Sequence, residues 1–299
     1  MTVRVLQFGT TGQLARELLA QAKDFDVEIT ALSRAEADFA DPAAVAAIAG
    51  AAQADLVVIA AAHTAVDQAE SEPDLVHTIN AEAPGAIARA LGPDGPALLH
   101  ISTDYVFDGE KGSPYAETDS PNPLNVYGAS KLVGEQAIAA SGARATILRV
   151  SWVVSSHGKN FVKTMLRMAA EGKPLKVVAD QFGRPTASRD LARFILAQAA
   201  RLAAAPAGDP VFGVHHFANA GEVTWQGFAK GIFEIALGAD APTVAAGSTA
   251  DWPAPARRAI RATLDTTKLE STFGVTLRPW REPVAEIVAE LQAQQRSAA

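Results

Sequence analysis

Val3-Arg4-Val5-Leu6-Gln7-Phe8-Gly9-Thr10-Thr11-Gly12-Gln13-Leu14-Ala15 is the stretch that decides the fold of this chain. Residues 3–8 predict a buried strand, and Leu14, Leu18 and Leu19 predict a helix directly after it. The glycines between them let the backbone turn sharply and approach a pyrophosphate, whose charge is favoured at a helix N-terminus. The order of strand, glycines and helix therefore predicts a dinucleotide-binding turn, with a tight turn that binds nothing as the alternative.

Strands and helices alternate along the first half of the chain. The expected strands are 27–32, 54–62, 97–103 and 145–152, and the expected helices are 42–52, 73–91 and 126–141. This alternation implies an α/β fold with a Rossmann-type, doubly wound parallel sheet. Ligands of such sheets lie beyond the carboxyl ends of the strands, so residues at those ends are the candidate site residues.

Beyond residue 152 the pattern loosens. It predicts helices at 159–170 and 188–204, short strands at 176–179 and 214–218, a small-residue linker at 203–210, and an irregular stretch at 242–255. We expect an NAD(P)-binding domain from 1–152 plus about 185–220. The smaller substrate-binding domain is expected from about 153–184 plus 221–299.

Composition narrows the class of protein. The 299 residues are 48% hydrophobic and 20% charged, which suffices for a large buried core. A net charge of −7 and a pI near 5.4 give no basic footprint for nucleic acid or a membrane surface. The chain has no cysteine, no signal-like segment and no apolar run of membrane-spanning length. We therefore expect a cytoplasmic protein that binds small molecules, with no nucleic-acid or membrane partner.

Tyr127 and Lys131 stand four residues apart at the start of the helix expected at 126–141. At this spacing both side chains share one helix face, so the ammonium can favour phenolate and lower the pKa of the tyrosine toward operating pH. A tunable phenol is a proton donor for carbonyl chemistry, although the same pair also occurs by chance in helices. Thr103, at the end of the strand 97–103, is a second candidate, with a polar strand end that bonds its own backbone as the alternative.

Several motifs together resemble the dTDP-4-dehydrorhamnose reductases, within the extended short-chain dehydrogenase/reductase superfamily. Besides the glycine turn and the Tyr/Lys pair, they are the runs Ala60-Ala61-Ala62-His63-Thr64-Ala65-Val66-Asp67 and Ser102-Thr103-Asp104-Tyr105-Val106-Phe107, and downstream Ser151-Trp152-Val153, Asn160-Phe161, Asp180-Gln181-Phe182-Gly183, Pro185-Thr186 and Leu264-Asp265. The resemblance covers nearly the whole chain. It implies reduction of the 4-keto group of dTDP-4-dehydro-6-deoxy-L-mannose to dTDP-L-rhamnose, the last step in making that sugar donor.

The resemblance also implies roles for individual residues. Tyr127 would deliver a proton to the developing alkoxide, Thr103 would donate a hydrogen bond to the same oxygen, and Lys131 would hold the nicotinamide ribose. The implied cofactor contacts are Gly9, Thr11, Gly12, Gln13, Leu14, Ser33, Arg34, Asp38, Phe39, Ala60, Ala61, Ala62, Ile101, Tyr127 and Lys131. The implied substrate contacts are Thr64, Val66, Thr103, Asp104 and Trp152.

Cofactor choice rests on Ser33 and Arg34, just past the strand 27–32. An acid there would take the ribose 2′-OH and an arginine can accommodate a 2′-phosphate, so we predict NADPH over NADH. The six histidines show no spacing suited to zinc. Magnesium and a homodimer are suggested by some relatives, and no acidic cluster in the sequence maps onto a magnesium site, so that ion stays unassigned.

The sequence departs from the family at Val154, Ala259 and Ala262, where many relatives carry tyrosine, proline and serine. All three fall in the predicted substrate region. Two other functions therefore stay open: another nucleotide-sugar epimerase, dehydratase or reductase, and a non-catalytic nucleotide-binding regulatory subunit.

Overall fold

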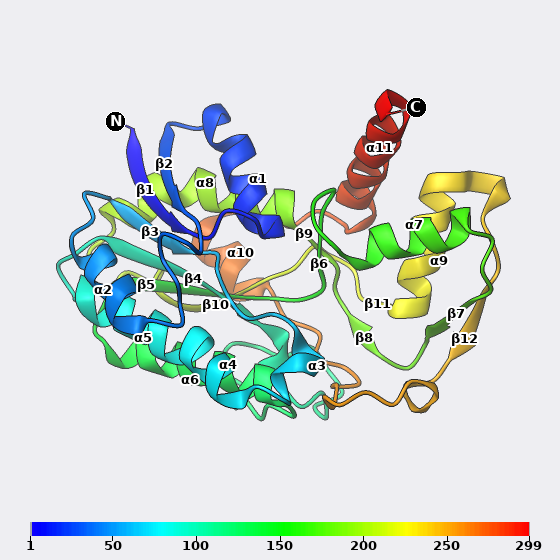
Figure 1. Cartoon of the computed structure of the whole chain (residues 1–299), viewed down its shortest axis with the longest axis horizontal. Helices are drawn as coiled ribbons and strands as arrows, with labels where there is room; N and C mark the ends of the chain where they lie inside the picture. The colour runs from blue at the N-terminus through cyan, green and yellow to red at the C-terminus, as the bar shows by residue number, and fades with distance from the viewer. Residues whose placement is uncertain (1, 299) are drawn as a thin grey trace.

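Six parallel strands form the central sheet, in the order β10-β5-β4-β3-β1-β2. The computed structural model describes residues 2–298 (Figure 1). The strands are β1 (Val3–Phe8), β2 (Val27–Leu32), β3 (Leu56–Ile59), β4 (Ala97–Thr103), β5 (Ala145–Val150) and β10 (Gly213–Phe217). The chain passes from β1 to β2 and then returns to place β3 on the other side of β1. This reversal is the point where doubly wound sheets bind their ligands, and it confirms the predicted fold class.

Helices cover both faces of the sheet (Figure 1). One face packs against α1 (Gln13–Gln21), α8 (Ser188–Ala204) and α10 (Thr267–Phe273). The other face packs against α2 (Pro42–Gly50), α5 (Ala83–Leu91) and α6 (Val126–Ala140). The apolar sequence of β3 follows from this arrangement, because every residue of that strand is buried.

The stretch predicted as one helix, 73–91, contains a change of helical type. It consists of α4 (Pro73–His77), a π-helical segment (Thr78–Glu82) and α5. The backbone of Asn80 lies so close to α6 that a Cβ on Gly134 would come within 2.2 Å of the Asn80 carbonyl oxygen. The π-helical segment therefore lies where α6 makes its closest approach.

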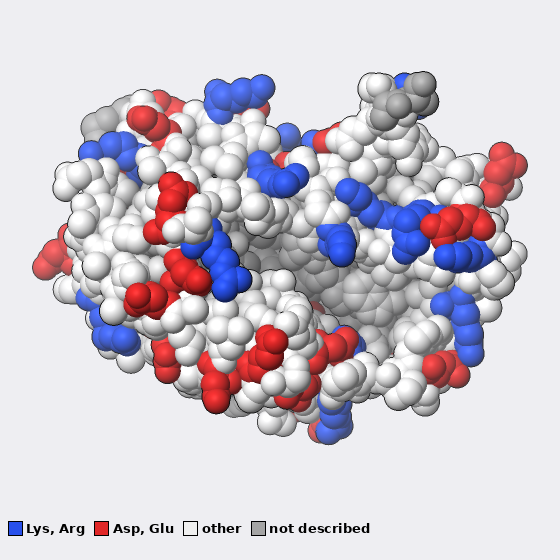
Figure 2. Space-filling view, viewed as in Figure 1, with Lys and Arg blue, Asp and Glu red and all other residues white. Residues whose placement is uncertain are grey.

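A second group of elements lies beside the sheet in Figure 1. Helices α7 (Phe161–Ala170), α9 (Trp225–Leu237) and α11 (Arg281–Ala298) pack with the paired strands β7 (Leu175–Val178) and β12 (Val244–Gly247) around one apolar cluster. Two further pairs are β6 (Val153–Val154) with β9 (Thr186–Ala187), and β8 (Phe182–Gly183) with β11 (Val223–Thr224). Figure 2 shows the molecule hollowed between this group and the sheet, with basic side chains at the rim.

Some predicted boundaries were wrong. The stretch 242–255 was expected to be irregular but contains β12, because Val244 joins the apolar cluster and the strand pairs with β7. The expected strand 54–62 is shorter, since the chain leaves the sheet after Ile59 and Ala60–Ala62 form a loop at its end. Likewise β5 ends at Val150, before Trp152. Among the described residues, no helix is long and apolar enough to cross a membrane.

Candidate active site

The glycine-rich turn joins β1 to α1 at the point where the strand order reverses. Gly9 has a φ of +100°, and a Cβ there would lie 3.3 Å from atoms of Ala60 and Ala61, so the turn packs against the loop after β3. Gly12 caps α1 without a side-chain hydrogen bond, and the first turn of α1 holds no acidic residue. The N–H groups of that turn are therefore suited to bind an anion, such as a pyrophosphate.

The side chain of Gln13, a predicted pyrophosphate contact, is bonded within the protein. Its Oε1 accepts hydrogen bonds from Ser155 Oγ and Asn160 Nδ2, both at 3.0 Å, and its Nε2 donates to the Val153 carbonyl at 3.3 Å. Gln13 thus ties the start of α1 to the segment after β5. Only its backbone N–H is left to meet a phosphate.

Past β2, the predicted cofactor-specificity residues are paired with acids. Glu36 Oε2 accepts from the backbone N–H and the hydroxyl of Ser33, at 2.9 and 2.7 Å. Arg34 Nε lies 3.4 Å from Asp38 Oδ2, and both side chains are largely exposed. Glu36 was not among the predicted site residues, although its position three residues after Ser33 is a turn signal.

The remaining predicted cofactor residues differ in what they present. Phe39 is buried in the core, with its ring 5.5 Å from that of Phe8, so only its backbone can reach a ligand. Leu14 and Ile101 pack in the apolar cluster under α1 and α8. Thr11 is exposed in the turn.

The loop after β3 carries the predicted substrate contacts Thr64 and Val66. Asn80, from the π-helical segment, holds this loop: its Oδ1 accepts from the His63 N–H at 2.9 Å, and its Nδ2 donates to the His63 carbonyl at 3.0 Å. The same amide donates to Ser130 Oγ on α6 at 3.1 Å. Asn80 therefore fixes the loop relative to the helix that carries Tyr127 and Lys131. A polar residue at a buried helix position was the available signal for it.

Tyr127, Thr103 and Asp104 come together where β4 ends and α6 begins. Asn125 caps α6 by accepting from the Gly128 N–H at 2.8 Å, and this places Tyr127 in the first turn. The Thr103 hydroxyl donates to Asp104 Oδ1 at 3.1 Å. Burial raises the pKa of Asp104 to about 7 and raises the pKa of Tyr127 above its usual value, while hydrogen bonding between Tyr127 and Thr103 opposes the second shift.

Lys131 is buried one turn further along α6. Its Nζ lies 3.0 Å from Nε2 of His100, a fully buried residue of β4 that was not a predicted site residue. Burial lowers the pKa of Lys131 to about 8, against the opposing charge of Glu135. The expectation that Lys131 would draw the pKa of Tyr127 downward was wrong for this structure, because burial of the phenol outweighs other effects.

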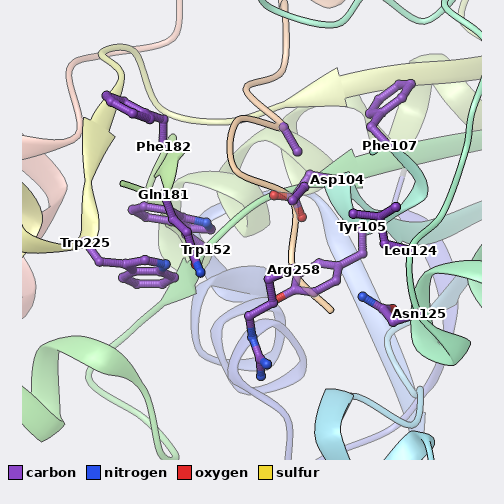
Figure 3. A pocket seen from close by; sticks show the side chains of 12 residues that line it. Asp104, Tyr105, Phe107, Leu124, Asn125, Trp152, Gln181, Phe182, Trp225 and Arg258 are labelled. Carbon is purple, nitrogen blue, oxygen red and sulfur yellow. The ribbon is translucent and has the colours of Figure 1, made fainter. Parts of the chain in front are cut away.

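Trp152 lies across a cavity from Asp104 and Tyr105 (Figure 3). Its ring stacks on Trp225 with centroids 3.6 Å apart, and its backbone has a φ of +44°, the sparsely populated left-handed region for a bulky residue. Gly183 lies beneath the indole, where a Cβ would come within 2.4 Å of it. Strain of this kind persists only when the surroundings hold it, and Trp152 is indeed held on two sides.

The cavity itself lies between the end of β4 and Trp152. Its walls include Asp104, Tyr105, Trp152, Gln181, Trp225 and Arg258, together with Ala259 and Ala262. It adjoins a groove of about 890 Å³ that carries both apolar and basic side chains. Arg258, Trp225 and Gln181 line both spaces, and none of them was a predicted site residue.

Arg258 is held in place by a residue from the far side of the groove. Its Nη1 and Nη2 lie 3.0 and 2.8 Å from the two carboxylate oxygens of Asp67, in α3 (Val66–Ala69). The chain between β12 and α10, which carries Ala259 and Ala262, is thus anchored to the loop after β3. Within residues 2–298 no group of three or more acidic or histidine side chains is placed to hold a metal ion.

The sheet, the glycine turn and the Thr103, Tyr127 and Lys131 set define an extended short-chain dehydrogenase/reductase. A family model described as the RmlD substrate binding domain matches residues 3–293. The curated dTDP-4-dehydrorhamnose reductase of Sinorhizobium fredii is 42% identical over 288 residues, which cover 96% of this chain and 97% of that protein. The chain therefore belongs to the dTDP-4-dehydrorhamnose reductase family.

Two further relatives inform the chemistry. The crystal structure of dTDP-4-dehydrorhamnose reductase from Bacillus anthracis in complex with NADP has a TM-score of 0.88 and 33% identity, and covers 97% of this chain and 100% of that one. A Streptomyces antibioticus protein, 36% identical over 97% of this chain and 96% of its own length, is named a probable dTDP-4,6-dihydroxy-2-methyloxan-3-one 4-ketoreductase. A relative of this chain is thus named for a different dTDP-linked keto sugar.

Proposed function

We propose that this chain catalyses the NADPH-dependent reduction of the 4-keto group of dTDP-4-dehydrorhamnose to give dTDP-L-rhamnose. Family membership gives the reaction class, and the relatives' names give the substrate. The observation that carries the proposal is the meeting of Thr103 and Tyr127 with Asp104, which lines a cavity whose opposite wall is aromatic. The two walls suit a sugar ring that presents one apolar face and one reacting oxygen.

Each residue has a role in this proposal. Tyr127, whose raised pKa keeps the phenol protonated, gives its proton to the oxygen that develops at C4 of the sugar. Thr103 donates a hydrogen bond to the same oxygen. Lys131 holds the nicotinamide ribose, and Trp152 contacts the sugar.

The residues of the glycine turn fit a dinucleotide, because the uncapped N-terminus of α1 and the close packing at Gly9 form a cradle for a pyrophosphate. When bound, NADPH supplies the hydride. Ser33 and Arg34 would face the ribose of the adenosine, with NADH as the alternative cofactor. Thr64, Val66 and Asp104 complete the substrate contacts that we propose.

The test is NADPH oxidation, followed by absorbance, with enzymatically prepared dTDP-4-dehydrorhamnose. Tyr127→Phe should lower kcat by about 10² to 10⁴, the usual loss for a general acid. Tyr115→Phe is the matched control, because it removes a phenol that bonds to Asp108 and does not line the cavity around Asp104. Absence of turnover by folded wild-type protein that binds NADPH would overturn the proposed substrate.

A second substrate deserves a parallel test. Ala259 and Ala262, where many relatives carry proline and serine, both line the cavity. Smaller side chains at this wall leave room for a differently substituted ring, so another dTDP-4-keto sugar is the second candidate. A panel of such sugars, compared by kcat/KM, distinguishes the two.

Three further proposals, on domain organisation, oligomeric state and location, rest on the family resemblance. The elements around β7 and β12 would form the substrate-binding domain, beside an NAD(P)-binding domain built on the sheet. The chain would act as a homodimer and in the cytoplasm. Light scattering on the purified protein tests the dimer, and fractionation of its source cells tests the location.

A further inference from the structure

His100 is a buried titratable residue that the proposed mechanism does not use. It lies on β4 and is fully buried, as is its neighbour Ser102 two residues along the same face. Its Nδ1 has no hydrogen-bond partner among the described residues. A buried imidazole with one unpaired nitrogen is costly, so a purely structural role would be served as well by an apolar side chain.

Among residues 2–298, the His100 side chain forms a hydrogen bond with Lys131 alone. Nζ of Lys131 and Nε2 of His100 are 3.0 Å apart. An ammonium group can only donate, so Nε2 must be the accepting nitrogen and the ring proton must reside on Nδ1. Burial and, to a lesser extent, the charge of Lys131 lower the pKa of His100, so the ring stays neutral and able to accept.

The other charged groups near Lys131 have partners of their own. Glu135, one turn along α6, accepts from Arg149 Nη2 at 2.6 Å and from Arg149 Nε at 2.9 Å, and it also bonds to Ser102. Arg149 in turn lies 3.4 Å from Nε2 of His216 on β10. Glu135 therefore stabilises the Lys131 ammonium through its charge and makes no hydrogen bond with it.

Two titratable groups, Asp104 after β4 and Tyr127 on α6, lie on the side of Lys131 toward the cavity. Asp104 bonds to Thr103, and Tyr127 packs edge-on against Tyr105 with ring centroids 5.4 Å apart. Of all these groups, His100 alone accepts a hydrogen bond from Lys131.

We propose that His100 is a positioning residue for this reductase: its Nε2 accepts a hydrogen bond from the Lys131 ammonium and fixes that ammonium for binding the nicotinamide ribose. A neutral acceptor suits this task, because a carboxylate in its place would neutralise the cation. Two of the three ammonium protons remain for the ribose. This inference rests on the proposed function for its rate measurements, and its binding measurement is independent of the sugar.

Three variants test the inference. His100→Leu removes the acceptor, and His100→Gln places an amide oxygen near the position of Nε2. His100→Asn keeps a buried amide that is too short to reach Lys131, so it serves as the test if the leucine variant does not fold. His215→Leu is the matched control, since it also removes a buried imidazole, on the edge strand β10 where the ring packs on Phe273.

The primary measurement is the Kd for NADPH as a function of pH. For the wild type we expect binding to weaken as the pH rises through about 8, the pKa of Lys131. The pH at which NADPH binding weakens is called the binding limb below. Loss of a hydrogen bond to a buried charge should move this binding limb to lower pH by about one to two units in His100→Leu and His100→Asn. His100→Gln should restore the wild-type position, and His215→Leu should leave it unchanged.

The alkaline limb of kcat should move in parallel with the binding limb. A limb that stays in place in the folded leucine and asparagine variants would overturn the proposal. So would a glutamine variant that folds but does not restore the wild-type limb, because the role would then not lie in accepting from Lys131. If neither the wild type nor any variant turns over dTDP-4-dehydrorhamnose while the pH dependence of NADPH binding shifts as expected, the substrate assignment fails and the role of His100 stands.

Discussion

Burial sets the protonation of Asp104, which closes one wall of the cavity. A carboxyl pKa of about 7 means that the group changes charge within the physiological range. Hydrogen bonds from the Thr103 hydroxyl and from the backbone at Asp104 and Tyr105 favour the carboxylate, but they do not offset the loss of water around it. The folded state therefore holds the proton of Asp104 up to about neutral pH, and the stability that this proton gives is lost as the pH rises toward that value.

The sign of this effect gives a stability prediction for Asp104→Asn. The folded-state pKa of Asp104 lies above the ordinary value of 3.8, so the folded state binds the proton more tightly than the unfolded chain does. The contribution of Asp104 to stability is full below about pH 4 and is lost as the pH rises to about 7, at roughly 1.4 kcal/mol for each pH unit between the two values. Asparagine carries no charge and should remove that slope.

Urea unfolding of wild type and Asp104→Asn between pH 5 and about pH 8 measures the difference. We expect the variant to gain stability relative to wild type as the pH rises, up to about pH 7. A constant difference across this range would show that Asp104 is ionised at all of these pH values. Asp108→Asn is the control, because hydrogen bonds from Tyr115, Glu110 and Asn122 lower the pKa of that half-buried carboxyl and it stays charged throughout.

Cofactor preference is a second residue-scale prediction, and it centres on Glu36. Its carboxylate binds both donors of Ser33, and Asp38 lies beside Arg34, so the charges at 34, 36 and 38 sum to −1 where a 2′-phosphate is expected. Glu36→Gln should therefore raise kcat/KM for NADPH about two- to fivefold and leave that for NADH unchanged. Arg34→Ala should lower kcat/KM for NADPH and leave that for NADH unchanged.

Steady-state kinetics with the two cofactors checks this preference. Glu28→Gln is the matched control, since it removes an exposed acid from β2 outside the turn that holds Ser33. An equal change for both cofactors in Glu36→Gln would place the 2′-phosphate elsewhere.

At the scale of elements, local patterns predicted the strands and helices that carry the site. The apolar runs placed β1, β2 and β4, and the capping residue Asn125 precedes the helix on which the Tyr/Lys pair lies. Contacts between distant parts of the chain were not predictable from local pattern. Asn80, His100 and Arg258 each bond to a partner in another element. The residues that flank them in the sequence do not predict which partner that is.

The contact between α6 and the π-helical segment gives the next prediction. Gly134→Ala would place its Cβ 2.2 Å from the Asn80 carbonyl oxygen, which is backbone and cannot move aside without shifting the segment. Overpacking of this kind costs about 1 to 3 kcal/mol. Because Asn80 also holds the loop at His63, kcat/KM should fall even where the variant is folded.

Gly50→Ala in α2 is the control for that variant. A Cβ there meets Ala90 at an ordinary 3.6 Å, so the substitution should be neutral or should stabilise the helix by up to about 1 kcal/mol. Thermal unfolding of the two variants measures the contrast. Equal stability of Gly134→Ala and wild type would mean that the segment shifts freely.

At the scale of the whole molecule, the hollow between the sheet and the second group of elements is bridged at separate places. Gln13 joins the cofactor turn to Ser155 and Asn160 at one side. Asp67 joins the loop after β3 to Arg258 at the other. The first bridge lies at the turn that we assign to the cofactor and the second at the walls assigned to the sugar, so disrupting each should affect a different ligand.

The Asp67–Arg258 bridge supplies the last prediction. Asp67→Asn removes the charge that anchors the segment bearing Arg258, Ala259 and Ala262, which line the cavity. The KM for the sugar nucleotide should rise about tenfold, equivalent to about 1.4 kcal/mol of lost binding, while the Kd for NADPH stays unchanged. Arg167→Met is the control, since it breaks an exposed pair with Glu171 at the end of α7.

In a double-mutant cycle, Arg258→Met should add little to Asp67→Asn if the arginine acts by holding the segment. A large further loss in the double variant would instead mean that Arg258 binds the substrate directly, and a raised NADPH Kd in Asp67→Asn would mean that the two sides of the hollow move together.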